Sequence, residues 1–195
     1  MNVALLEAVA EPILIDGLSW QEFKSIEQLI DRPGIRLSFL DGVLEIRKMP
    51  GRQHETVKKR IAALLEIYLE FKEFDFTPTG SMTLESEAGS VKREADESYE
   101  LGSDNTQPDL AIEVAITSGG IDKLEAYKRL AIPEVWIWQN ATLSLFALGA
   151  GGYEKITQST LLPDLDMDLF KRCLDLSKHA QALRELQQNI ASASS

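Results

Sequence analysis

An acidic residue placed among apolar neighbours is the first feature of this sequence that points to chemistry. In the segment 109–116, the two-residue period of a strand puts Leu110, Ile112, Val114 and Ile116 on one face and Asp109, Ala111, Glu113 and Ala115 on the other. Glu113 would then lie in the middle of an interior strand, where a carboxylate loses its hydration and must be paired or bind a cation. The small side chains at 111 and 115 leave room beside it. Glu113 is therefore a candidate for metal binding or catalysis.

A second carboxylate, Asp96, lies in the acidic segment that precedes this strand. If the segments 93–99 and 109–116 pair antiparallel, Asp96 would lie across from Glu113 with the Cβ atoms about 5 Å apart. That separation suits two carboxylates that share a divalent metal ion. Asp109 is four residues from Glu113, roughly 13 Å along a flat strand, so it would join the metal site only if the strand bends at its start.

Lys123 is the third candidate, at the start of a helix expected over 122–130. The loop 117–120 would bring it near the C-terminal end of the Glu113 strand. A lysine there can orient a metal-bound water and stabilise the charge that develops on a phosphorane-like transition state. Mg²⁺ suits a site made of carboxylate oxygens, and metal-assisted phosphodiester hydrolysis uses these parts together.

Each of these residues also has an interpretation without catalysis. Glu113 could form a buried ion pair with Lys123 and do no chemistry. Asp96 stands in an acidic run, which is typical of a solvated strand edge, and a lysine at a helix start is typical of a surface. His54 could serve only to order the start of the long helix that follows it.

The elements that must position these residues follow from local patterns. Ser19 and Glu22 form a capping box that predicts a helix ending before Pro33-Gly34, and Asp41-Gly42 predicts a tight turn between two strands. Strands are expected at 35–39, 43–46, 81–84, 93–101, 110–116, 134–138, 142–148 and 153–156, and further helices at 54–74, at 122–130 and as one last amphipathic helix carrying Phe170, Leu174, Leu183 and Leu186. This order predicts the α/β class, with a mixed β-sheet core flanked by helices.

Composition limits the possible partners and locations. The chain has 195 residues and a net charge of −11, which predicts one domain over 1–195, with a frayed tail at 191–195, and excludes a generally basic nucleic-acid coat. The single cysteine, Cys173, is expected in a helical core and fits a reducing cytoplasm. The opening residues 1–10 do not resemble a signal peptide, and no apolar stretch is long enough to span a membrane. Basic residues gather at 47–60 and acidic ones at 85–113, an arrangement compatible with grasping a phosphate backbone.

Five sequence blocks follow one another along the chain: DGVLEI at 41–46, EADESY at 94–99, PDLAIEV at 108–114, DKLEAY at 122–127 and IPEVW at 132–136. Together they resemble the Uma2 family of restriction endonuclease-like proteins. The resemblance implies a restriction endonuclease-like PD-(D/E)XK fold, and an active site that uses Mg²⁺, with Mn²⁺ as a substitute.

The resemblance also implies a role for each candidate residue. Asp96 would be the aspartate of the motif and Glu113 its second acidic residue, while Lys123 would replace the lysine usually found where Ala115 stands. Glu45 would add an acidic group and His54 a further pocket residue. Asp109 stays a candidate for an assisting metal ligand on the residues alone.

These residues lead to a prediction and two alternatives. The chain is expected to be a cytoplasmic, Mg²⁺-dependent endonuclease that cleaves DNA as a homodimer, since an acidic chain needs help to approach DNA. The first alternative is a catalytically silent relative that binds DNA or protein. The second is a purely structural ion-pair core. The resemblance implies an acidic residue where Ala115 stands, and its absence is compatible with the first alternative, a weakened or inactive member.

Overall fold

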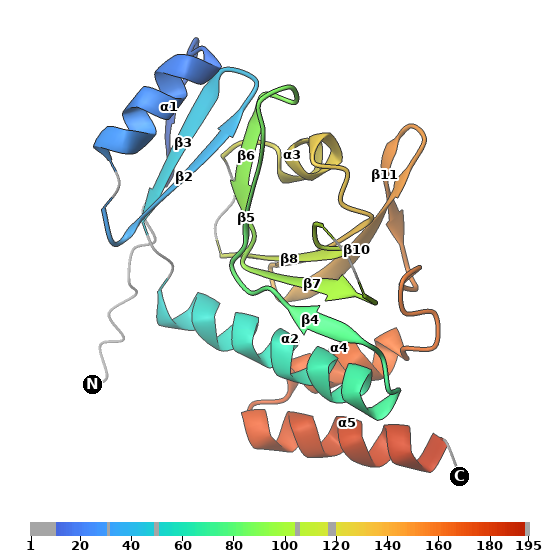
Figure 1. Ribbon diagram of the computed structural model, residues 1–195. Helices are drawn as coiled ribbons and strands as arrows, with labels where there is room; N and C mark the ends of the chain where they lie inside the picture. Colours follow the sequence, from blue (N-terminus) through green and yellow to red (C-terminus); the bar gives the residue numbers. More distant parts are fainter. Residues whose placement is uncertain (1–10, 31, 49–50, 104–105, 117–119, 194–195) are drawn as a thin grey trace, which may run out of the picture.

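The computed structural model describes residues 11–30, 32–48, 51–103, 106–116 and 120–193 (Figure 1). The helices are α1 (Trp20–Leu29), α2 (Arg52–Phe71), α3 (Lys123–Arg129), α4 (Met167–Asp175) and α5 (His179–Ala193). The strands are β1 (Ile13–Ile15), β2 (Ile35–Leu40), β3 (Val43–Lys48), β4 (Phe76–Pro78), β5 (Thr83–Ser86), β6 (Val91–Glu94), β7 (Glu97–Leu101), β8 (Leu110–Ala115), β9 (Glu134–Gln139), β10 (Thr142–Gly149) and β11 (Gly152–Ile156).

The described strands form two sheets rather than one. One sheet has the order β1-β3-β2-β6-β5, and the other has the order β11-β10-β9-β8-β7-β4. In the second sheet β8 and β9 pair in parallel, while β7 pairs with β8 antiparallel. The predicted mixed sheet flanked by helices is therefore confirmed, and so is the antiparallel pairing expected for the two acidic segments.

The strand expected over 93–101 is interrupted at Ala95 and Asp96, so its prediction as one strand was wrong. The amide of Ala95 donates to Met82 O, beside the first sheet, and the amide of Asp96 donates to Ile112 O in the second. The chain thus leaves one sheet and joins the other within two residues. Asp96 lies at this junction, next to the central strand β8.

Helices cover the six-stranded sheet on both faces (Figure 1). Leu110, Ile112 and Val114 pack into the core formed with α2, α4 and α5. Ala111 packs on the opposite face, in the core that joins α3 and the five-stranded sheet. The alternation predicted for β8 is confirmed, and it directs Glu113 toward the space between the two sheets.

The C-terminal segment forms two helices, so the single amphipathic helix predicted there was wrong. Arg60 of α2 donates hydrogen bonds to the carbonyl oxygens of Leu174 and Leu176 and so satisfies the end of α4. Cys173 is buried in α4, as predicted. Helix α5 continues to Ala193, within the tail expected to fray, while 194–195 and the opening segment 1–10 lie outside the described residues.

No described helix has both the length and the apolar composition that crossing a membrane requires.

A buried carboxylate anchors the loop after β11. Glu134, at the start of β9, is fully buried and accepts hydrogen bonds from the indole N–H of Trp136 at 2.7 Å and from the amide and hydroxyl of Thr160 at 2.8 and 2.6 Å. The amide of Leu161 adds a longer contact of 3.3 Å. Glu134 therefore fastens the loop to the sheet through neutral donors.

Candidate active site between the two sheets

Charged side chains are buried where the two sheets face each other. We call the charged cluster the set Glu45 of β3, Arg93 of β6, Asp96, Glu113 of β8 and Lys123 of α3. Its carboxylates and its arginine are at most 4% exposed. Charges in such a position persist only when each is paired and hydrogen-bonded, so the contacts of each member decide what the cluster can do.

Glu113 is held mainly by Arg93. The Nε and Nη2 atoms of Arg93 donate to the two carboxylate oxygens of Glu113 at 2.9 and 2.7 Å, a bidentate ion pair. The hydroxyl of Tyr127 donates to Glu113 Oε1 at 2.6 Å. Lys123 Nζ lies 3.9 Å from Glu113 Oε2, so the predicted lysine does reach the predicted carboxylate.

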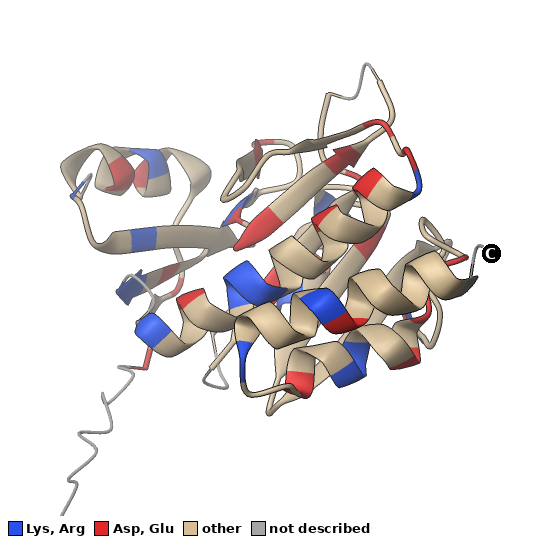
Figure 2. Cartoon of the chain, turned by 90° about the horizontal axis from the view of Figure 1, so that it is seen from below, with Lys and Arg blue, Asp and Glu red and all other residues tan. Residues whose placement is uncertain are grey.

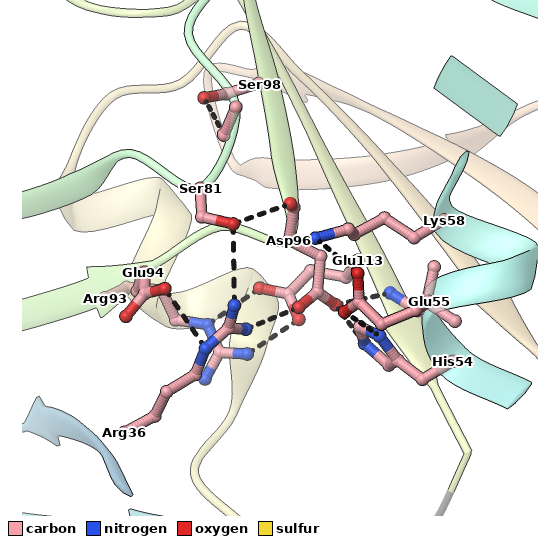
Figure 3. Close-up of polar contacts among 12 residues, drawn as sticks. Arg36, His54, Glu55, Lys58, Ser81, Arg93, Glu94, Asp96, Ser98 and Glu113 are labelled. Carbon is pink, nitrogen blue, oxygen red and sulfur yellow. Dashed lines mark hydrogen bonds and ion pairs between the residues drawn. The ribbon is translucent and has the colours of Figure 1, made fainter. Parts of the chain in front are cut away.

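Asp96 lies among donors from three different elements (Figure 3). Arg36 Nη1 of β2 contacts Asp96 Oδ1 at 2.7 Å, while His54 Nε2 of α2 and the amide of Val114 contact Oδ2 at 3.0 and 2.8 Å. Burial alone would raise the pKa of Asp96, but the hydrogen bond and charge of His54, with the Val114 amide and Arg36, lower that pKa well below its usual range. Asp96 is therefore an anion at neutral pH.

His54 joins Asp96 to a second ion pair on α2. Its Nδ1 atom lies 3.3 Å from Glu55 Oε1, and Glu55 Oε2 lies 3.1 Å from Nζ of the buried Lys58. These contacts fix the orientation of the imidazole ring. His54 can therefore hold the Asp96 carboxylate in one rotamer.

Glu45 ties β3 to the segment that leads into α3. Its Oε1 atom accepts from Arg47 Nη2 at 2.8 Å and from the amide of Ile121 at 3.2 Å, and its Oε2 atom lies 3.5 Å from Arg93 Nη1. A Cβ atom on Gly120 would overlap the side chains of Glu45 and Arg47. Glu45 therefore positions the backbone just before Lys123.

Lys123 belongs to the charged cluster and also lines a hollow of about 300 Å³ at the C-terminal ends of β8 and β9. Ala115, Ile121 and Gln139 also line this hollow. Burial lowers the pKa of Lys123; Glu113 opposes the effect, and the positive charges of Arg93 and Arg47 add to it. An ammonium group at the edge of such a hollow is well placed to meet an anionic ligand.

The structure brings five of the six predicted residues into one network. Arg93 joins Glu113 to Glu45, and Lys123 contacts Glu113. Asp96 and His54 form a second set, which meets the first where the amide of Val114, next to Glu113, donates to Asp96. Asp109 is elsewhere: it precedes β8, and its Oδ2 atom accepts from the amide of Leu101 at 2.8 Å. The strand does not bend back at its start, so Asp109 is not grouped with Glu113 as a metal ligand.

The basic segment 47–60 does not act as one surface. Arg60 is directed to the end of α4, Lys58 is buried, and the exposed Lys59 pairs with Glu97 at 3.1 Å. At the start of the segment Arg47 pairs with Glu45, and Lys48 and Arg52 are exposed. The predicted phosphate-binding region is therefore smaller than the sequence indicated.

Arg36, Arg93 and Tyr127 are site residues that the sequence analysis missed. A signal for Arg93 was present, because Val91, Arg93 and Ala95 alternate with Lys92 and Glu94 and so share an apolar face. Arg36 and Tyr127 contact the site through tertiary packing, and their local sequence carries no such signal.

The oxygens of Glu45, Asp96 and Glu113 are hard donors, the kind that Mg²⁺ prefers. Within the described ranges, no three His, Cys, Asp or Glu side chains are gathered as a ready-made metal site. The donor set fits a divalent cation by its chemistry, and Arg93 lies between Glu45 and Glu113, where it contacts both.

Comparisons with known proteins agree with this architecture. A solved protein from Anabaena variabilis ATCC 29413, described as "a putative nuclease belonging to DUF820", is similar in fold, with a TM-score of 0.51 and 11% sequence identity over 87% of this chain and 99% of that chain. This likeness confirms the predicted fold class. No curated protein matches the sequence. The model of the Uma2 family, described as "Putative restriction endonuclease", matches residues 20–176, so this chain belongs to the Uma2 family.

Proposed function

We propose that this protein hydrolyses phosphodiester bonds in DNA, with Mg²⁺ as its cofactor and Mn²⁺ as a substitute. The observation that carries the proposal is the contact of the partly buried Lys123 with the buried Glu113, 3.9 Å apart beside Asp96, on a fold shared with a protein described as "a putative nuclease". Family membership supports the same activity. A partly buried lysine with a lowered pKa beside a carboxylate is typical of functional sites.

Asp96 and Glu113 would hold the metal ion. Glu45 would assist them, because it contacts Arg93, which also contacts Glu113. When bound, the cation would polarise the phosphate and activate water for attack. The protein residues supply the rest of the chemistry. His54 is a positioning residue, because it orients Asp96 through a 3.0 Å contact.

Lys123 would bind the phosphate that enters the neighbouring hollow. Its ammonium group stabilises the negative charge that grows on the phosphoryl oxygens in the transition state. Burial strengthens this electrostatic interaction, because less water screens the charge. Glu45 contributes indirectly by fixing the backbone that carries Lys123.

The DNA backbone would meet the protein near Arg47, Lys48 and Arg52. Figure 2 shows that Lys and Arg are interspersed with Asp and Glu over the helices on one side of the molecule, so that side offers no uniformly basic face. With a net charge of −11, a groove formed by two copies would help the chain approach DNA. A homodimer in the cytoplasm is therefore part of the proposal, and a light-scattering mass of one chain would contradict it.

Arg93 favours one alternative. Arg93 occupies both oxygens of Glu113, and Ala115 stands where the resemblance to the family implies a charged residue. The chain could therefore bind DNA or protein without cleaving it. In this alternative the protein keeps the nuclease-like fold but does not cleave DNA.

Cleavage of supercoiled plasmid DNA with Mg²⁺ or Mn²⁺ tests the proposal. We expect Glu113→Gln to slow cleavage about 1,000-fold, since it removes a group that acts on the transition state. Glu134→Gln is the matched control, because it changes a buried carboxylate away from the site; its folded fraction should cleave at the wild-type rate. Cleavage that survives Glu113→Gln would contradict the proposed site. No cleavage by the wild type would favour the non-cleaving alternative.

A further inference from the structure

Arg93 is the most tightly paired member of the charged cluster. It is 3% exposed, and it contacts Glu113 through two nitrogens and Glu45 through a third. Although burial opposes its charge, the neighbouring Glu113, Tyr127 and Glu45 raise the pKa of Arg93 further. The guanidinium is therefore a permanent cation held between two buried carboxylates.

The carboxylates around it already have cationic partners. In the described part of the chain, each of Glu45, Glu94, Asp96 and Glu113 forms an ion pair with at least one of Arg36, Arg47, Arg93 and Lys123. Buried carboxylates without such partners would attract a cation strongly. Here the protein itself supplies the positive charge.

The carboxylate oxygens of Glu113 that a metal ion would use already accept hydrogen bonds from Arg93. Both oxygens accept from Arg93 at 2.7–2.9 Å, and Oε1 also accepts from Tyr127. A Mg²⁺ ion must approach a carboxylate oxygen to about 2.1 Å. Its charge would then repel the Arg93 guanidinium, which contacts the same carboxylate. Glu45 offers Arg93 a second acceptor at 3.5 Å if the pair with Glu113 opens.

We propose that Arg93 is a resident counter-ion that competes with the divalent cation for Glu113. Metal binding at Glu113 then requires the Arg93–Glu113 ion pair to open, and Arg93 sets how weakly the metal binds. This inference rests on the proposed metal-dependent function and names the residue that regulates the site.

Binding of Mn²⁺ to the full chain without DNA tests the inference, measured by the loss of the free Mn²⁺ signal in electron paramagnetic resonance. We expect Arg93→Gln to bind Mn²⁺ about tenfold or more tightly than the wild type, because a competing charge has been removed. Arg93→Lys keeps the charge but loses the bidentate geometry, so its affinity should fall between the two. Arg47→Gln is the matched control: it removes a neighbouring cation that pairs with Glu45, and should raise the affinity less than Arg93→Gln.

Circular dichroism in chelator establishes which variants fold without metal. If Arg93→Gln does not fold, Arg93→Lys carries the test, and it must still bind Mn²⁺ more tightly than the wild type. Equal Mn²⁺ affinity in the wild type and the Arg93 variants would overturn the inference while leaving the proposed metal-dependent function in place. An equal gain from Arg47→Gln would also overturn it, since the effect would then be general. Absence of Mn²⁺ binding by all variants would overturn both the inference and the metal dependence.

Discussion

Glu113 and Glu134 are buried carboxylates on the neighbouring parallel strands β8 and β9, and they face opposite sides of the same sheet. Glu134 lies opposite Leu110, on the side covered by α2, α4 and α5, whereas Glu113 lies opposite Ile137, on the side of α3. The donors that the structure places on Glu134 are neutral. Those placed on Glu113 are a guanidinium and a tyrosine hydroxyl, with an ammonium nearby.

The difference teaches how to separate a structural carboxylate from a chemical one in this fold. Backbone amides and an indole are fixed by the chain around them, so the bonds to Glu134 hold a loop and have little freedom to change. Arg93 and Lys123 sit at the ends of long side chains and can exchange partners. On the Glu113 side, Lys123 contacts Glu113 and also lines a hollow of about 300 Å³ at the C-terminal ends of β8 and β9.

Replacing Lys123 should have the largest of the effects that distinguish the Glu113 side of the sheet from the Glu134 side. We expect Lys123→Ala to slow plasmid cleavage about 100-fold, since it removes the group that would stabilise the charge on the phosphate. Lys128→Ala, on the exposed side of the same helix, should cleave at the wild-type rate. Full activity in Lys123→Ala would remove the functional distinction between Glu113 and Glu134.

The pH dependence of cleavage tests the same lysine. The pKa of Lys123 is lowered by burial, so the ammonium loses its proton at a lower pH than an exposed lysine does. Because the protonated form is the one that stabilises the phosphate, the wild-type rate should decline as the pH rises through that lowered pKa. The residual rate of Lys123→Ala should lack this decline, and the same decline in both proteins would assign it to another group.

Replacing Asp96 should have a smaller effect, on the free energy of unfolding. Its pKa is lowered in the folded protein, so its contribution to stability is present above the pKa of the unfolded chain and is lost as the pH falls through the folded value. We expect Asp96→Asn to lower the free energy of unfolding by about 3 kcal/mol at neutral pH, because Arg36 and His54 lose their charged partner.

Urea denaturation in chelator at several pH values measures this contribution. The stability difference between the wild type and Asp96→Asn should shrink toward zero in strong acid. A difference that does not change with pH would mean that the carboxylate charge of Asp96 does not stabilise the fold.

Much of the fold was accessible from local patterns. The Asp41-Gly42 turn predicted the hairpin of β2 and β3, and both residues have the positive φ that such a turn needs, 50° and 87°. The break between β6 and β7 was not accessible, because it depends on which sheet accepts each strand. The end of α4 depends on Arg60, which is 114 residues from Leu174 in sequence.

Some residues of the candidate site could likewise be predicted from the sequence, and others could not. Glu113 could be found from its position on an apolar strand, and Asp96 from the antiparallel pairing expected with that strand. The partners of these carboxylates could not be found by spacing, since Arg36 reaches Asp96 from 60 residues away. Whether Lys123 or Arg93 neutralises Glu113 depends on how the two sheets pack.

The backbone before α3 offers the smallest and sharpest test of the comparison. Gly120 has φ of 95°, and a Cβ atom there would meet Glu45 and Arg47. Gly120→Ala should lower the free energy of unfolding by about 2 kcal/mol, from backbone strain and from the displaced Glu45. Gly151→Ala is the matched control, because nothing lies within 4 Å of its Cβ position, and it should change stability little.

If Gly120→Ala also slows cleavage in the folded protein, Glu45 holds Lys123 in place for the reaction. An unchanged rate would reduce Glu45 to the role of Glu134, a carboxylate that fastens a loop.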